Sequence, residues 1–279
     1  MVWGLARLIG PTENVLVTIP ISHYCEKARW ALDRAGVAYE ESPHVQALHR
    51  IATRRAGGGL TAPVLVCAEG VLADSADILS WADTQSRPGH DLYPDDAVQA
   101  TDVRQIEDDF NARLGPHSRC WLYQQLRRRR DLAIGYGSAG IPTWERATLR
   151  LGYPALIAIV ARVLDVTPAN AILSEREVRA TFDEVGERLS DGRRYICGDE
   201  FTAADLTFSA LAAPMLMPLD YGVPLPQPEE LPAYAAKVVH EMRAHPAGAH
   251  ALKMFKTERR QQTGPAQTER HRQTGPAQN

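Results

Sequence analysis

The pattern of hydrophobic and polar positions changes once along the chain, close to residue 87. Before that point, short apolar runs alternate with amphipathic stretches. The apolar run at 15–19 and the segment 37–45 predict strands, because short apolar runs bounded by turn residues are typical of a sheet. Residues 25–35 lie between them and predict a helix that ends near Gly36.

The same alternation continues up to the change in pattern. Residues 46–55 predict a short helix that ends in a run of glycines. Two short apolar segments, 63–67 and 71–72, are joined by Glu69-Gly70 and predict a hairpin. A helix is predicted from Asp74 to about Gln85. The order β-α-β-α-β-β-α therefore predicts an α/β layer with a mixed sheet.

Beyond a linker at 87–96, the pattern predicts helices alone. Val103, Ile106, Phe110 and Leu114 follow one another three or four residues apart, which places them on one face of a helix. Gly115-Pro116 should kink or interrupt this helix, because proline removes a backbone donor. Trp121 to Leu126 are expected to continue the helix after the break. Further helices are predicted at 149–164, 174–189, 202–216, 231–244 and 248–256.

Two of these predicted helices carry a recognisable start signal. Ser174 and Glu177 fit a capping box, in which each side chain binds the other residue's backbone N–H. Thr202 and Asp205 have the same spacing at the start of the helix that continues to 216. That helix is apolar on nearly every face, which predicts that it forms the buried centre of a bundle.

These patterns divide the chain into four parts. The tail contains Gln-Thr-Gly-Pro-Ala-Gln twice, at 262–267 and 273–278, and the Gly-Pro of each copy argues against a continuous helix. We therefore expect an α/β domain, a linker, an all-helical domain and a disordered tail, at 1–86, 87–96, 97–256 and 257–279.

The composition narrows the class of protein. The chain has 279 residues, 44% of them hydrophobic, and a net charge of −3, which gives no global attraction to nucleic acid or to a membrane surface. Residues 1–10 have too short an apolar run for a signal peptide, and no apolar stretch approaches the length of a membrane span. The four cysteines are scattered, which suits a reducing cytoplasm and provides no zinc framework. We expect no metal.

The first predicted helix starts with a pattern suited to sulfur chemistry. Ser22 and Cys25 stand three residues apart just after the first strand. The first turn of a helix exposes unpaired N–H groups and the positive end of the helix dipole. Because such an environment lowers the pKa of a thiol, this turn is a place to hold a thiolate.

Two other segments of the first domain supply matching binding groups. Pro63 begins a strand, and a cis Ala62-Pro63 bond would leave the Ala62 backbone free to pair with an extended ligand. Asp74 and Ser75 start a helix, whose free N–H groups suit a ligand carboxylate while the Asp74 carboxylate suits an ammonium group. A thiol, a peptide backbone and an α-amino acid end are the three parts of glutathione.

With these motifs the chain resembles the glutathione transferase family over roughly residues 14–256. The matching segments are 22–29, Ala62-Pro63-Val64-Leu65, Asp74-Ser75 and 202–206. The resemblance implies a thioredoxin-like N-terminal domain followed by an all-helical C-terminal domain, and a homodimer. It also implies that glutathione, as co-substrate, is transferred to a small electrophile of mostly apolar character.

The resemblance assigns roles to particular residues. Ser22 occupies the activating position of the serine-type classes, and glutathione would contact Ser22, His23, Ala62, Pro63, Asp74 and Ser75. Two positions depart from the family pattern. Asp74 stands where Glu is commoner, and no Lys precedes Ala62-Pro63, which leaves Arg54, Arg55 or His49 as candidates for the glycyl carboxylate of glutathione. The pocket for the second substrate would include Tyr24, together with His117, Arg119 and Tyr123 after the Gly115-Pro116 break, although these three can equally be ordinary helix surface.

Each of these residues has an ordinary alternative. Ser22 can be a plain helix cap, and Tyr24 an aromatic side chain packed beside the site. Cys25 can be a redox thiol or a buried inert one, and Arg29 is expected in a buried salt bridge. Two other functions therefore stay open: a thiol oxidoreductase that uses Cys25, and a non-catalytic interaction or stress-response protein with the same fold.

Overall fold

The computed structural model describes residues 14–259, and the first elements follow the predicted order. Four strands form one sheet in the order β2-β1-β3-β4: β1 (Asn14–Thr18), β2 (Tyr39–Pro43), β3 (Val64–Cys67) and β4 (Gly70–Leu72). β1 pairs parallel to β2 and antiparallel to β3, so the sheet is mixed, as predicted.

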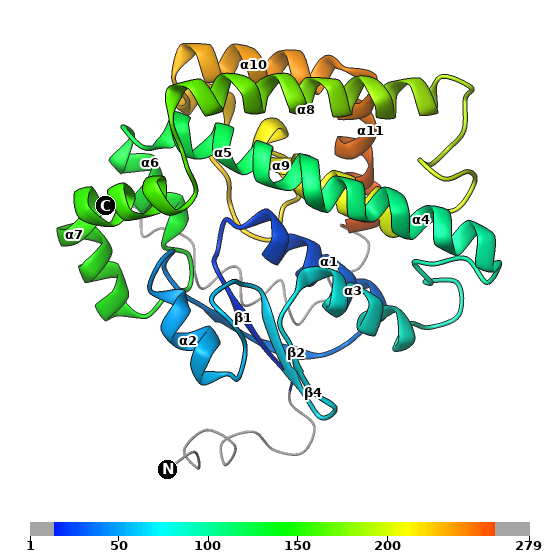
Figure 1. Cartoon of the computed structure of the whole chain (residues 1–279), viewed down its shortest axis with the longest axis horizontal. Helices are drawn as coiled ribbons and strands as arrows, with labels where there is room; N and C mark the ends of the chain where they lie inside the picture. Colours follow the sequence, from blue (N-terminus) through cyan, green and yellow to red (C-terminus); the bar gives the residue numbers. More distant parts are fainter. Residues whose placement is uncertain (1–13, 260–279) are drawn as a thin grey trace.

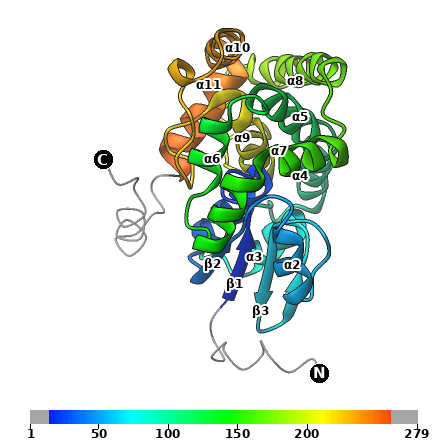
Figure 2. The ribbon, with the colours of Figure 1, turned by 90° about the vertical axis from the view of Figure 1, so that its left-hand side faces the viewer.

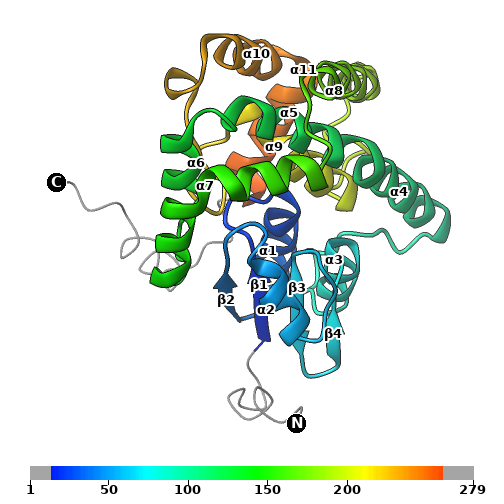
Figure 3. The ribbon, with the colours of Figure 1, turned by 60° about the vertical axis from the view of Figure 1, so that its left-hand side comes forward.

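Three helices cover this sheet. α1 (His23–Ala35) packs against α3 (Ser75–Thr84), and α2 (His49–Arg55) lies on the opposite face of the sheet from both (Figure 3). Ser22 caps the start of α1, and Gly36 ends it in the left-handed region at φ 71°, which glycine adopts without steric cost. The predicted thioredoxin-like layer is thus confirmed.

The helices of the rest of the described chain lie mostly on the far side of α1 from the sheet, and α7 reaches down beside it (Figures 1 and 2). Its elements are α4 (Ala97–Asp109), the π-helical turn η1 (Phe110–Leu114), α5 (Gly115–Leu126), α6 (Arg130–Gly137), α7 (Thr143–Val163), α8 (Pro168–Leu189), α9 (Ala203–Leu216), the 3-10 turn η2 (Pro228–Glu230), α10 (Ala233–Ala244), α11 (Pro246–Met254) and the π-helical turn η3 (Phe255–Arg259).

The centre of the helical domain is α9, as its composition predicts. Every residue of α9 is buried, and the Thr202–Asp205 capping box is present at its start. The Asp205 carboxylate also accepts hydrogen bonds from the Ile196 N–H and from His250 Nε2. One buried carboxylate therefore joins the start of α9 to the preceding loop and to α11.

Other boundaries differ from the predictions. Ser174 lies inside α8, whose N-cap is Thr167 with Pro168 in the first turn, so the capping box predicted at Ser174 and Glu177 is wrong. The apolar face of α8 continues back to Ala171, and Thr-Pro is the stronger start signal. The predicted interruption at Gly115-Pro116 takes the form of the π turn η1 directly before it.

The helical domain also contains more helix than the pattern predicts. α6 was not predicted, because the glycines within it lower its helix propensity and the neighbouring arginines do not add to an apolar pattern. At the other end, η3 continues to Arg259, which is buried, whereas disorder was expected from 257. The repeats at 262–267 and 273–278, like residues 1–13, lie outside the described residues.

Within residues 14–259, no single helix is both long and apolar enough to cross a membrane. α7 and α8 taken together pass that test of length and composition, but the pair is bent by 59° at the break between them.

A buried ion pair joins α1 to the helical domain. Lys27 Nζ donates to Glu107 Oε1 of α4 at 2.7 Å and to Asn111 Oδ1 at 3.0 Å. The Tyr93 hydroxyl donates to the second oxygen of Glu107 at 2.5 Å. Burial lowers the pKa of Lys27, and the adjacent Glu107 carboxylate opposes this shift. The direct ion-pair partner of the ammonium group is therefore a carboxylate from the other domain.

Replacing Glu107 with Leu should destabilise the protein by about 3–5 kcal/mol, because it leaves the Lys27 charge buried without its ion-pair partner. Chemical denaturation of the wild type and the variant measures this loss. The double variant Lys27→Met/Glu107→Leu should recover most of it, although both variants leave the Tyr93 hydroxyl without its acceptor. A double variant no more stable than Glu107→Leu contradicts the explanation.

Candidate functional site

A cavity of about 600 Å³ lies where the two domains meet. The N-terminal domain contributes the start of α1, the segment before β3 and the start of α3. The helical domain contributes η1, α5, α6 and α7. Most of the residues that the sequence assigned to the site line this one cavity, namely Ser22, His23, Tyr24, Ala62, Pro63, Asp74, Ser75 and Tyr123.

Ser22 lies at the turn between β1 and α1. Its extended backbone, at φ −74° and ψ 123°, makes it the N-cap residue, and its Oγ accepts the Cys25 N–H at 3.4 Å. The hydroxyl hydrogen has no acceptor among the described residues, since Oγ serves only as acceptor there. Ser22 is thus both a helix cap and a hydrogen-bond donor available to a ligand in the cavity.

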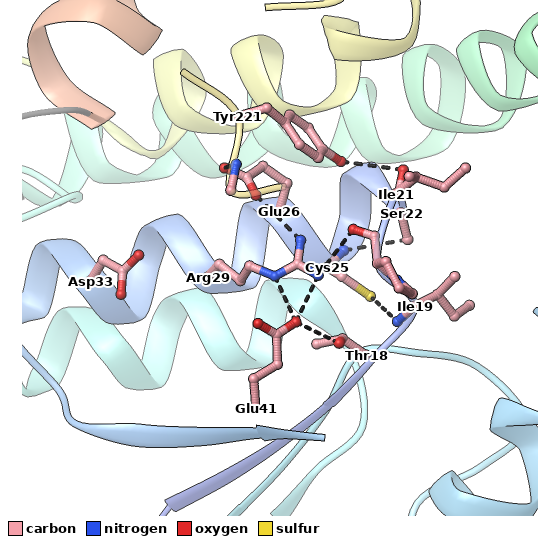
Figure 4. Close-up of polar contacts among 12 residues, drawn as sticks. Thr18, Ile19, Ile21, Ser22, Cys25, Glu26, Arg29, Asp33, Glu41 and Tyr221 are labelled. Carbon is pink, nitrogen blue, oxygen red and sulfur yellow. Dashed lines mark hydrogen bonds and ion pairs between the residues drawn. The ribbon is translucent and has the colours of Figure 1, made fainter. Parts of the chain in front are cut away.

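Cys25 is not among the residues that line the cavity, and its Sγ points toward the Ile19 backbone (Figure 4). Its side chain is fully buried, and its Sγ accepts the Ile19 N–H at 3.3 Å. Burial raises the pKa of the thiol, although Arg29 and these hydrogen bonds oppose the shift. The structure therefore gives Cys25 a packing position and an environment that disfavours its thiolate.

His23 and Tyr24 fasten the first turn of α1 to the helical domain. His23 Nε2 donates to the Gly115 carbonyl at 3.0 Å, and the Tyr24 hydroxyl donates to the Asn111 carbonyl at 3.1 Å. A side chain at position 115 would collide with the Tyr24 hydroxyl, so glycine is needed there. Burial lowers the pKa of His23 to about 3 and raises that of Tyr24 to about 12.

The segments at Ala62-Pro63 and Asp74-Ser75 line the same cavity, as the sequence suggested. The Ala62-Pro63 bond is cis, and the pairing of β3 with β1 starts only at Val64, beyond Ala62. Asp74 is the N-cap of α3, and its Oδ1 accepts the Ala76 N–H at 2.8 Å. The other Asp74 carboxylate oxygen has no hydrogen bond among the described residues and is available to a ligand.

One arginine of the cavity wall was missed by the sequence reading. Arg50 of α2 lines the cavity, and its Nε is buried with no hydrogen-bond partner in residues 14–259. The candidates named instead fit less well, since Arg54 and Arg55 are exposed outside the cavity wall. His49 lines the cavity, but both of its ring nitrogens are used, one by Ala47 and one by Leu60.

Arg119, which the sequence also suggested for the second-substrate pocket, lies on α5 and lines the cavity one helical turn before Tyr123. His117, by contrast, is not part of the cavity wall, because its Nδ1 pairs with Ser174 Oγ of α8 at 3.1 Å. The wall beyond Tyr123 is mainly apolar and includes Leu126, Leu156 and Val160.

A network of charged side chains around Arg29 and Glu26 holds α1 in place (Figure 4). Arg29 binds Glu26 at 3.3 Å and Glu41 of β2 at 2.7 Å, which confirms the buried salt bridge expected for it. It also donates to the Pro20 carbonyl, in the turn just before Ser22. Glu26 in turn accepts from Arg259 and from the Gly222 N–H of the helical domain.

The described residues contain no group of three or more His, Cys, Asp or Glu side chains placed to hold a metal ion.

Comparison with known families identifies the chain. Residues 16–89 match the model of the glutathione S-transferase N-terminal domain, and residues 158–236 match that of the glutathione S-transferase C-terminal domain. The two matches together cover more than half of the chain. The protein therefore belongs to the glutathione S-transferase family. No curated protein matches the chain significantly.

Solved structures show the same fold. A glutathione S-transferase from Methylobacillus flagellatus KT with glutathione bound is 15% identical, at a TM-score of 0.56, over 89% of this chain and 98% of that one. A glutathione S-transferase from Xanthobacter autotrophicus Py2 is 16% identical, at 0.54, over 88% and 93%. Glutathione S-transferase-I bound with lactoylglutathione is 14% identical, at 0.59, over 89% and 97%. Identities this low establish a likeness of fold only.

The buried His23 predicts an acid-sensitive stability. Its imidazole stays neutral in the fold down to about pH 3, whereas in the unfolded chain it binds a proton below about 6.5. In that window the unfolded state binds more protons, so stability falls as the pH falls. Between pH 6.5 and 5, protonation of this group in the unfolded chain should lower the free energy of unfolding by about 2 kcal/mol.

The measurement is urea denaturation at pH 7 and pH 5 for the wild type and for His23→Gln, which keeps a donor for the Gly115 carbonyl but does not titrate. The variant should lose less stability on acidification than the wild type. Equal losses in the two proteins would show that His23 is not the source.

Proposed function

We propose that this protein is a glutathione transferase, in which Ser22 stabilises the thiolate of bound glutathione for attack on an electrophilic, mostly apolar small molecule. The observation that carries the proposal is the cavity between the domains, where a free hydroxyl at a helix N-terminus stands opposite an apolar wall. Membership of the family and the glutathione bound by one structural neighbour support the same ligand.

Ser22 can supply the energy that this role requires. A thiol with a pKa near 8.5 must lose about 2 units to be mostly ionised at neutral pH, which corresponds to about 2.7 kcal/mol. A hydrogen bond to a charged acceptor contributes about 1.5–3 kcal/mol. The N-terminus of α1 adds about 0.3–1 kcal/mol. Ser22 therefore acts as a donor to the thiolate and needs no base of its own.

The other cavity residues match the remaining parts of glutathione. The Ala62 backbone, which precedes the paired part of β3, would bind the cysteinyl peptide groups. The free Asp74 oxygen suits the γ-glutamyl ammonium group, and the N-terminus of α3 at Ser75 suits its carboxylate. Arg50, with its unpartnered Nε, takes the glycyl carboxylate in place of the missing lysine.

The burial of Cys25 argues against the thiol oxidoreductase alternative. A thiol that forms mixed disulfides must be reachable and partly ionised. The Cys25 side chain is fully buried, its pKa is raised by that burial, and it lies outside the cavity wall.

We further propose that the protein is a cytoplasmic homodimer, as the family resemblance implies. All four cysteines are free thiols in the structure, in keeping with a reducing compartment.

Substituting Ser22 with Ala should raise the pKa of the bound glutathione thiol by about 1–2 units, because it removes the free hydroxyl donor of that turn, where the Tyr24 hydroxyl already donates to the Asn111 carbonyl. At neutral pH, kcat/KM for conjugation should fall by about 10-fold or more, in proportion to the lost thiolate. The pKa is followed through the ultraviolet absorbance of the thiolate against pH.

Cys25→Ala is the matched control in the same turn and should leave the pKa of the bound thiol close to that of the wild type. Activity that survives Ser22→Ala but is lost in Cys25→Ala would instead favour the oxidoreductase. Failure of the wild type to bind glutathione in calorimetry would favour a non-catalytic protein.

Arg50→Gln should weaken glutathione binding by about 10-fold, through loss of a charge-assisted hydrogen bond to the glycyl carboxylate. Isothermal calorimetry with glutathione measures the effect. Arg54→Gln removes the same charge from the exposed face of the same helix and should have little effect. Equal weakening in both variants would point to long-range attraction rather than a contact.

A further inference from the structure

One face of α5 forms a wall of the cavity whose character changes from charged to apolar. Arg119, Leu122, Tyr123 and Leu126 all line the cavity. Their spacing of three, four and seven residues places them in one stripe along the helix. Since a helix rises about 1.5 Å per residue, the stripe runs about 10 Å from the arginine to the last leucine.

The charged end of this stripe lies over the start of α1. The Arg119 guanidinium carbon is 5.9 Å from the centre of the Tyr24 ring, two residues along the chain from Ser22. Burial is the main cause of the lowered pKa of His23, and the charge of Arg119 adds to it. Arg119 therefore lies beside the turn that carries Ser22, where the sulfur of glutathione would lie on the proposed function.

Arg119 has no anionic partner among the described residues. It makes no hydrogen bond and no ion pair there, whereas the nearby Arg113 binds both Asp109 and Glu184. The two carboxylates that line the cavity do not pair with it: Asp74 caps α3, and Asp108 forms no ion pair. A guanidinium group in this position is a site for an anion.

The anions of glutathione are already matched by other groups. On the proposed function, its glycyl carboxylate belongs to Arg50, its γ-glutamyl carboxylate to the start of α3, and its thiolate to Ser22. The negative group for Arg119 must then come from the other reactant. Next to it along α5 the wall turns apolar, so that reactant would extend an apolar body away from its anionic end.

We propose that the second substrate is an amphiphilic acid, whose anionic group binds Arg119 beside the sulfur and whose apolar body lies along α5 toward Leu126. This inference rests on the proposed function and adds the class of electrophile to it. Arg119 is then the residue that determines specificity for acids over neutral electrophiles.

A probe with this polarity is (E)-4-oxo-4-phenylbut-2-enoic acid, and its methyl ester is the neutral counterpart. The glutathione thiolate forms a C–S bond at the carbon next to the carboxylate. The C=C π electrons move toward the ketone to give an enolate, which then takes a proton from water. The reacting carbon is thus adjacent to the anion, and the phenyl ring lies at the far end.

The experiment compares kcat/KM for acid and ester in the wild type, Arg119→Gln, Arg119→Lys and the control Arg128→Gln, an exposed arginine just beyond α5. Taking the acid-to-ester ratio within each protein cancels the difference in intrinsic reactivity. This ratio should fall by about 10-fold or more in Arg119→Gln, the effect of losing a charge-assisted contact. Arg119→Lys should restore part of it, and Arg128→Gln should leave it unchanged.

Other outcomes separate the inference from the proposed function. If Arg119→Gln slows acid and ester equally and raises the pKa of bound glutathione thiol, Arg119 serves the thiolate and the inference is overturned. An unchanged ratio in Arg119→Gln overturns it as well. If the wild type conjugates neither compound and does not bind glutathione, the proposed function itself fails.

Discussion

The structure depends on the burial of α1 between the sheet and the helical domain. Every residue of this helix except Tyr24 is buried, including Glu26, Lys27 and Arg29. Buried charges are tolerated only when they are paired, and here the partners come from both domains. Glu41 of β2 and Pro20 hold one side, whereas Glu107 and Arg259 hold the other. The ion pairs therefore fix how the two domains meet.

This constraint also explains where the cavity forms. Arg29 binds the carbonyl of the turn before Ser22, and His23 and Tyr24 bind the backbone around η1. The turn that carries Ser22 is thus held from both sides, facing α5 and α7. The two domains therefore contribute different parts of the site. The N-terminal domain supplies the groups proposed to bind glutathione, and the helical domain supplies an apolar wall and the guanidinium group of Arg119, which has no ion-pair partner among the described residues.

Much of the fold could be predicted because its signals are local. The order of the strands, the Thr202 capping box and the apolar run of α9 depend on residues close in sequence, and the structure confirms them, although β2 is shorter than the predicted strand at 37–45. The errors have physical causes too. Ser174 has the sequence signal of a helix cap, but the helix begins earlier, at the N-cap Thr167, so Ser174 lies inside it and binds His117 of α5. Arg259 looks like part of a disordered tail until its buried ion pairs with Glu26 and Asp33 are seen.

The sequence by itself determined the two-domain order and the helix start at Ser22, because caps, periodicity and turn residues act within a few positions of the chain. It also identified the segments at Ala62-Pro63 and Asp74-Ser75, through their motifs. Only the tertiary structure decided that Cys25 is buried, that His117 faces α8, and that Arg50 and Arg119 face the cavity. Burial and side-chain direction depend on contacts between distant segments, which no local pattern contains.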